Sequence, residues 1–89
     1  MKITVKKKHL ALATKARNSW NYSSYRDCLV AQAVKEKFPN REVSCRISTV
    51  FMGGHLYNID KDGRNLIIDF VNEVPLELPV TIVLTLSEE

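Results

Sequence analysis

Two cysteines and two histidines are the side chains of this 89-residue chain best suited to nucleophilic or general-base catalysis: Cys28, Cys45, His9 and His55. A thiol in the first turn of a helix has a lowered pKa, and a nearby imidazole would complete a Cys-His pair. Cys28 lies where the sequence predicts such a turn, but no local motif marks either cysteine. A chain this short also offers little volume for a pocket. The sequence therefore predicts that the protein is not an enzyme.

The same four residues are the ligand inventory of a tetrahedral zinc site. Structural zinc sites bring their ligands in close pairs, whereas each of these residues is isolated in the sequence. We therefore expect no metal and no other cofactor. Cys28 and Cys45 are 17 positions apart on different predicted elements, which does not make a disulfide framework. We expect two small, buried thiols that a cytosolic setting keeps reduced.

The first 26 residues are basic and carry seven lysines and arginines without any acid, whereas residues 60–89 carry seven acids. Trp20, Tyr22 and Tyr25 lie in the same basic third. Cations that follow phosphates beside aromatic rings that stack on bases are typical of single-strand binders. The candidate nucleic-acid-binding residues are Lys6, Lys7, Lys8 and Lys15. A solvated strand end and aromatic rings that cap the core would explain the same pattern, so this function is our alternative prediction.

Residues 18–26, with the sequence NSWNYSSYR, have the composition of a protein-binding loop. Rigid aromatic side chains alternate there with adaptable Ser and Asn, and Trp, Tyr and Arg are frequent anchors of interfaces. The candidate partner-binding residues are Arg17, Trp20, Tyr22, Tyr25 and Arg26. A homo-oligomer is the other partner we expect, through the strand Val80–Leu86 if that strand forms a sheet edge.

Helices and strands must position these residues, and the sequence predicts those of the first half of the chain as follows. Alternation over residues 2–6 predicts a strand, residues 7–13 a short helical turn, and residues 14–22 a loop. The main helix begins at Ser23 or Ser24, which can cap it, and ends near Phe38, because Pro39 cannot extend the hydrogen-bond ladder.

The second half is predicted to be mainly strands. Residues 43–51 alternate, Gly53 and Gly54 allow a tight hairpin turn, and His55–Ile59 returns as the partner strand. Residues 60–74 fit either a hairpin or a capped helix, of which we favour the helix. Val80–Leu86 is the last strand. The fold class is therefore a small single α+β domain over residues 1–89. It has the order β-(short helix)-α-β-β-α-β and a mainly antiparallel sheet with the main helix packed on one face. The predicted core consists of Val30 or Ala31, Val34, Phe38, Ile47, Phe70 and Ile82.

Apolar residues make up 45% of the chain and charged residues 26%, which is typical of a globular domain. The N-terminus lacks the apolar core of a signal peptide, and no apolar run is long enough to span a membrane. We therefore expect a cytoplasmic protein without a membrane partner.

The pattern of core positions and turns resembles a group of small uncharacterised tailed-phage and prophage proteins. It comprises the run CLVAQAV at residues 28–34, Phe38-Pro39, the Gly-Gly hairpin with Tyr57, Phe70, and VPLELP at residues 74–79. Those proteins usually have a Cys-Pro pair at the start of the helix, whereas here Leu29 follows Cys28. The resemblance implies viral origin and an accessory role, and it supplies no catalytic residues. We accordingly expect a non-enzymatic protein that binds a host or phage protein in the infected bacterium, such as an inhibitor of CRISPR-Cas defence.

Overall fold

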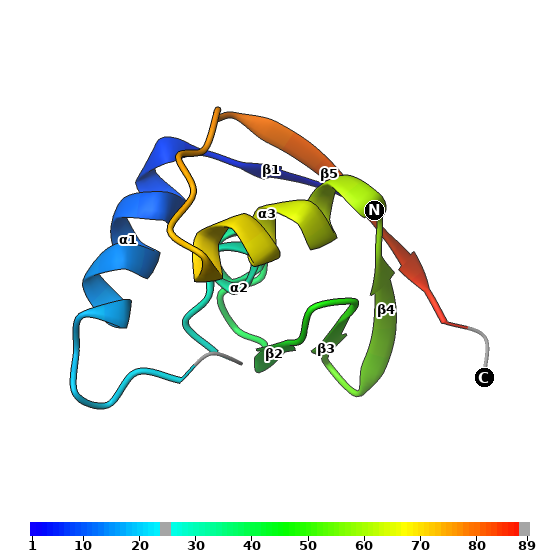
Figure 1. Ribbon diagram of the computed structural model, residues 1–89. Coiled ribbons are helices and arrows are strands. Elements are labelled where there is room, and N and C mark those ends of the chain that lie inside the picture. Colours follow the sequence, from blue (N-terminus) through cyan, green and yellow to red (C-terminus); the bar gives the residue numbers. More distant parts are fainter. Residues whose placement is uncertain (24–25, 88–89) are drawn as a thin grey trace.

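The structure is a computed structural model that describes residues 1–23 and 26–87. It is a small α+β domain, as predicted (Figure 1). In chain order its elements are β1 (Lys2–Val5), α1 (Lys7–Arg17), α2 (Leu29–Lys37), β2 (Val43–Cys45), β3 (Thr49–Met52), β4 (His55–Ile59), α3 (Lys61–Val71) and β5 (Val80–Leu86). The predicted order of elements is confirmed, except that residues 43–51 form two strands instead of one.

The five strands form one antiparallel sheet in the order β1-β5-β4-β3-β2. The first half of β5 pairs with β1, from Val80 opposite Val5 to Val83 opposite Lys2, and its second half pairs with β4. Val80–Leu86 is therefore not an edge of the sheet, and the condition for the expected homo-oligomer through this strand is not met, because β1 pairs with its first half and β4 with its second half. The edges of the sheet are β1 and β2.

Helix α2 lies on the inner side of the curled sheet and makes the centre of the core. In Figure 1 the sheet curls from β1 and β5 through β4 to β3 and β2, and α2 is seen end-on inside this curve. Leu29, Val30, Ala31 and Val34 of α2 have no exposed surface. This confirms that the main helix packs on one face of the sheet, since burial of an apolar stripe is what stabilises a short helix.

The two N-terminal helices differ from their predicted lengths. Helix α2 begins only at Leu29 with Cys28 as its N-cap, because Asp27 accepts a hydrogen bond from the Ser23 N–H at 3.1 Å and closes a turn before the helix. The other predicted cap, Ser24, lies outside the described residues. Helix α1 extends to Arg17 instead of ending at residue 13. It buries His9 and Ala13 and packs against α2, a tertiary contact that overrides its weak local pattern.

The strand predicted over residues 43–51 is interrupted after Cys45. The Arg46 N–H donates to the Thr49 carbonyl at 2.8 Å, so that residues 46–48 form a turn and β3 folds back on β2. The turn resets the alternation, and Val50 becomes buried while Ile47 is 56% exposed. The prediction that Ile47 is buried is therefore wrong, and Phe38 is only half-buried. The other predicted core residues are confirmed, namely Val30, Ala31, Val34, Phe70 and Ile82.

Residues 61–71 form a helix, which confirms the favoured reading of this segment. Asp60 is its N-cap: one carboxylate oxygen accepts from the Gly63 N–H at 2.9 Å and the other from the Val83 N–H at 3.0 Å. Gly63 has no room for a Cβ atom, which would lie 2.3 Å from Ile59 Cγ2, so the first turn of α3 packs directly on the sheet. Within the described chain, no helix is long and apolar enough to cross a membrane.

Candidate functional site

The residues predicted to form one partner-binding surface are placed in different surroundings. Arg17 turns toward α3, where it donates to the Phe70 carbonyl at 2.7 Å and lies over the Phe70 ring at 4.4 Å from the centroid. It also forms an ion pair with Glu73 at 3.7 Å. Arg17 therefore joins the end of α1 to the end of α3.

The aromatic residues of the predicted loop also differ in their exposure to solvent. Trp20 is 96% exposed just beyond α1. Tyr22 is half-buried, and burial followed by the neighbouring Cys28 raises the pKa of its hydroxyl. Tyr25 lies outside the described residues. Arg17 lies close enough to Tyr22 for its charge to act on the Tyr22 hydroxyl, whereas the Trp20 side chain is in solvent.

The lysines of the alternative nucleic-acid prediction lie at the start and along the length of α1. Lys8 forms an ion pair with Glu36 of α2 at 2.7 Å and, together with His9, lowers the pKa of this carboxyl. Lys6, Lys7 and Lys15 are exposed. Part of the N-terminal positive charge is therefore used to connect α1 to α2.

A prominent concave feature of the described residues is a cleft of about 770 Å³, which we call the basic cleft. It lies between the turn that precedes α2, the second half of α2, and the edge strand β2. Its lining includes Arg26, Lys35, Arg41, Glu42, Ser44 and Phe51. Three cations and one carboxylate give it a positive charge. Of the predicted partner-binding residues that the structure describes, Arg26 lies here.

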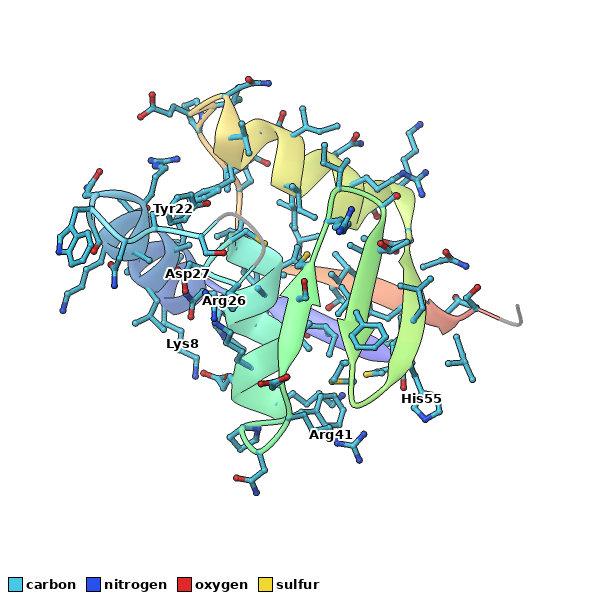
Figure 2. All side chains as sticks on the ribbon, turned by 90° about the horizontal axis from the view of Figure 1, so that it is seen from below. Lys8, Tyr22, Arg26, Asp27, Arg41 and His55 are labelled. Atoms are coloured by element: carbon cyan, nitrogen blue, oxygen red, sulfur yellow. The ribbon has the colours of Figure 1, made fainter. Side chains whose placement is uncertain are left out.

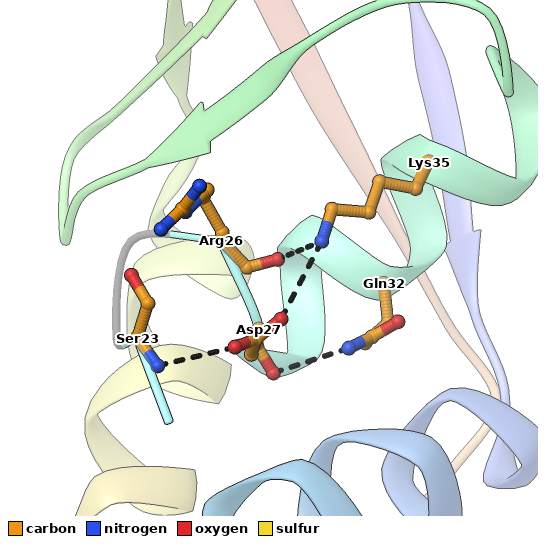
Figure 3. A network of polar contacts seen from close by, with 5 residues as sticks. All are labelled: Ser23, Arg26, Asp27, Gln32 and Lys35. Carbon is orange, nitrogen blue, oxygen red and sulfur yellow. Dashed lines mark hydrogen bonds and ion pairs between the residues drawn. The ribbon is translucent and has the colours of Figure 1, made fainter. Parts of the chain in front are cut away.

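A network of polar contacts around Asp27 fixes one side of the basic cleft (Figure 3). The Asp27 carboxylate accepts from the Ser23 N–H and lies 3.6 Å from the Lys35 ammonium, which also donates to the Arg26 carbonyl. Gln32 donates to the Asp27 carbonyl at 3.4 Å. The network holds the turn that carries Arg26 and balances the charge of Lys35, while the Arg26 side chain points away from it.

Arg41 lies at the other end of the basic cleft. Its guanidinium lies 5.8 Å from the centroid of the Phe38 ring and also against the turn between β3 and β4, where a Cβ atom on Gly53 would be 2.8 Å from Arg41 Nη1. Figure 2 shows Arg26 near the first turn of α2 and Arg41 beyond its last turn. Among the described residues, no carboxylate lies within ion-pair distance of either guanidinium. The cleft therefore offers two separated guanidiniums to an anionic partner.

A second pocket of about 510 Å³ brings Cys28 and Cys45 together, which the sequence did not predict. Both thiols are free and buried, as expected. The neighbouring Cys45 thiol is the main cause that lowers the pKa of Cys28, and Cys28 in turn raises the pKa of Cys45. We call these two residues the thiol pair. Its only signal in the sequence is the position of Cys28 near a helix start.

The histidines do not join the thiol pair. His9 is buried between α1 and α2, where its Nδ1 accepts from the Lys6 N–H at 2.9 Å and its Nε2 lies 3.3 Å from Glu36. His55 is exposed at the β3–β4 turn (Figure 2). In the part of the chain that the structure describes, no group of three or more His, Cys, Asp and Glu side chains could hold a metal ion.

The fold and these two features define a small α+β domain with a basic surface cleft and a buried thiol pair. Comparisons with protein-family models, with curated proteins and with solved structures found no match to this chain. The function proposed below rests on the geometry of the cleft and on the resemblance in sequence.

Proposed function

We propose that this chain is a non-enzymatic phage accessory protein that binds an acidic surface of a host or phage protein through the basic cleft. Its role would be that of an inhibitor of a bacterial defence system such as CRISPR-Cas, in the cytoplasm of the infected bacterium. The observation that carries the proposal is the placement of Arg26 and Arg41 on either side of an open cleft, with no carboxylate of residues 1–23 or 26–87 in an ion pair with either of them. The resemblance to phage and prophage proteins supports the viral origin.

The lining of the cleft has the chemistry of a protein interface. A guanidinium can bind a carboxylate through two parallel hydrogen bonds, so each arginine suits an Asp or Glu side chain of a partner. Phe51 is 50% exposed beside them and offers apolar area. Aromatic residues and arginines are the types that most often carry the binding energy of an interface. Lys35 contributes less, because Asp27 already balances its charge.

Capture of partners with charge-reversed variants tests this proposal. The protein is immobilised and exposed to lysate from bacteria with an active CRISPR-Cas system, in parallel with the double variant Arg26→Glu/Arg41→Glu. The matched control is Lys61→Glu, which reverses an exposed charge at the start of α3, outside the cleft.

We expect a partner that wild type and Lys61→Glu retain and the double variant loses, with the melting temperature of all three proteins within a few degrees. Loss of hot-spot contacts worth about 2 kcal/mol would weaken binding roughly 30-fold. Equal capture by all three proteins would contradict the proposed site.

Nucleic-acid binding is the second candidate, and the exposure of Trp20 favours it. Trp20 is the only tryptophan of the chain, follows α1 with its exposed lysines, and is 96% exposed. Stacking of a base on such a ring is worth about 1 to 3 kcal/mol. A single-stranded oligonucleotide should then quench the fluorescence of Trp20 and bind less tightly as salt rises from ~50 to ~200 mM. Replacing Lys6, Lys7 and Lys8 together by Ala should reduce that salt dependence, and no quenching at low salt would remove this candidate.

A further inference from the structure

The thiol pair lies in a pocket of its own, separate from the basic cleft. Cys28 comes from the start of α2 and Cys45 from the end of β2, and both line the same pocket together with Tyr22, Ile47 and Ile67. The two cysteines are 3% and 1% exposed. A small reagent that enters the pocket would therefore meet two neighbouring sulfur atoms.

The two thiols have different surroundings, which indicate which of them loses its proton first. Cys28 is the N-cap of α2, and the neighbouring Cys45 thiol first, then the nearby amides of Ala31 and Val30 at the positive end of the helix, lower the pKa of its thiol. The Cys45 thiol donates to the Arg46 carbonyl at 3.4 Å and also lies against Cys28. Cys28 is therefore the thiol that loses its proton first, and Cys45 keeps its proton beside it.

We propose that Cys28 and Cys45 are a redox-active dithiol site that hydrogen peroxide converts into an intramolecular disulfide. The Cys28 thiolate attacks one oxygen of the peroxide and the O–O bond breaks, which gives Cys28 sulfenic acid and a hydroxide that becomes water with the proton released by Cys28. The Cys45 sulfur then attacks the Cys28 sulfur and the S–O bond breaks. The hydroxide that leaves takes the Cys45 proton as water, so one peroxide is reduced to two waters while two thiols are oxidised to one disulfide.

The pocket has room for a small, uncharged oxidant. Its volume of about 510 Å³ far exceeds the size of peroxide, and Ile47, which is 56% exposed, lies at its border with solvent. The disulfide would tie the first residue before α2 to the last residue of β2. The site and the partner-binding cleft are tested separately, because neither cysteine lines the basic cleft.

The test uses the full chain, reduced, freed of reductant and treated with a small molar excess of hydrogen peroxide at pH 7. We expect the monomer to lose the mass of two hydrogens and both titratable thiols. Trypsin should then release the segment 27–35 linked to the segment 42–46, which carry the two cysteines. An unfolded sample treated in the same way shows whether burial alone protects the thiols.

Variants assign the roles of the two thiols. Cys45→Ser should accumulate a sulfenic acid on Cys28 that dimedone traps, whereas Cys28→Ser should react with peroxide at least tenfold more slowly. Ser48→Ala is the matched control, since Ser48 lines the same pocket and carries no sulfur. In case a cysteine variant fails to fold, the wild type is treated with a limiting amount of methyl methanethiosulfonate, and Cys28 should be modified first. The proposal is wrong if the native protein forms no disulfide while the unfolded chain does, if disulfides join two chains instead, or if Cys45 is the faster thiol.

Discussion

Replacement of Arg17 by Ala should destabilise the protein without weakening partner binding. Arg17 reaches from α1 to the end of α3, where its side chain is only 27% exposed and its guanidinium contacts both the carbonyl and the ring of Phe70. The sequence alone predicts Arg17 as a partner-binding residue. The structure instead indicates that it holds two helices together.

The size of the effect follows from three contacts. A hydrogen bond from a charged donor contributes about 1.5 to 3 kcal/mol, and the lower value applies because the Phe70 carbonyl keeps a second donor, the Glu73 N–H at 3.2 Å. The cation–π contact adds roughly 0.5 to 1 kcal/mol. The ion pair with Glu73 adds almost nothing, since Glu73 is 77% exposed. We therefore expect Arg17→Ala to lower the free energy of unfolding by about 2 kcal/mol.

Urea unfolding and thermal melting measure this loss directly. For a domain of this size, 2 kcal/mol corresponds to a fall of roughly 8 to 16 °C in melting temperature. Arg17→Lys should lie between Ala and wild type, because it keeps the charge and loses the planar fork. Lys15→Ala, an exposed change one half-turn earlier in α1, is the matched control and should be neutral. An Arg17→Ala variant as stable as the control, with weakened binding of a captured partner, would refute the reasoning.

Three further predictions test the fold and its charges. Ile47→Ala should change the free energy of unfolding by no more than about 0.5 kcal/mol, whereas Val50→Ala should lower it by roughly 2 kcal/mol. The reason is that the turn after β2 leaves Ile47 exposed and Val50 buried. Equal losses in urea unfolding would argue for one continuous strand. Phe38 is only half-buried, so Phe38→Ala should cost less than the roughly 3 to 5 kcal/mol of a fully buried phenylalanine. Leu29→Ala, in the centre of the core, should cost about 2 to 5 kcal/mol. A larger loss for Phe38→Ala than for Leu29→Ala in the same assay would contradict the placement of α2. The pKa of the Glu36 carboxyl is lowered, first by Lys8, so its carboxylate stabilises the folded state above the usual Glu pKa of about 4.3. This stabilisation is lost as pH falls through the lowered pKa. Glu36→Gln should therefore be less stable than wild type at pH 7, and the difference should shrink as the carboxyl becomes protonated in acid.

Local signals in the sequence were sufficient for the elements that depend on their own residues. The helix near residues 29–37 follows from apolar spacing and Pro39, and the hairpin follows from Gly53 and Gly54, whose φ angles are +59° and +81°. The helix at residues 61–71 was open between two readings, and the Asp60 cap with its hydrogen bond to Gly63 settles it. Each of these features is determined within a few residues along the chain.

Features that depend on distant residues were missed. The extension of α1 to Arg17 depends on packing against α2. Whether β5 is an edge is open from the sequence, because its inner position depends on β1, with the N-terminal ammonium donating to the Leu84 carbonyl at 2.9 Å. The thiol pair joins residues from two elements, so no spacing in the sequence reveals it. The same reason explains why Arg26 was identified as a surface residue but grouped with Arg17, which lies elsewhere.

Mapping of the bound surface on the protein tests the central claim most directly. The chain is labelled with ¹⁵N, and its amide NMR signals are followed while the captured partner is added, which reports the contact surface residue by residue. We predict that the largest changes fall on residues 41–44, on Phe51 and on Arg26, around the basic cleft, and that Arg26→Glu/Arg41→Glu abolishes them. Changes confined to α1 and Trp20, with the cleft residues unaffected, would contradict the account.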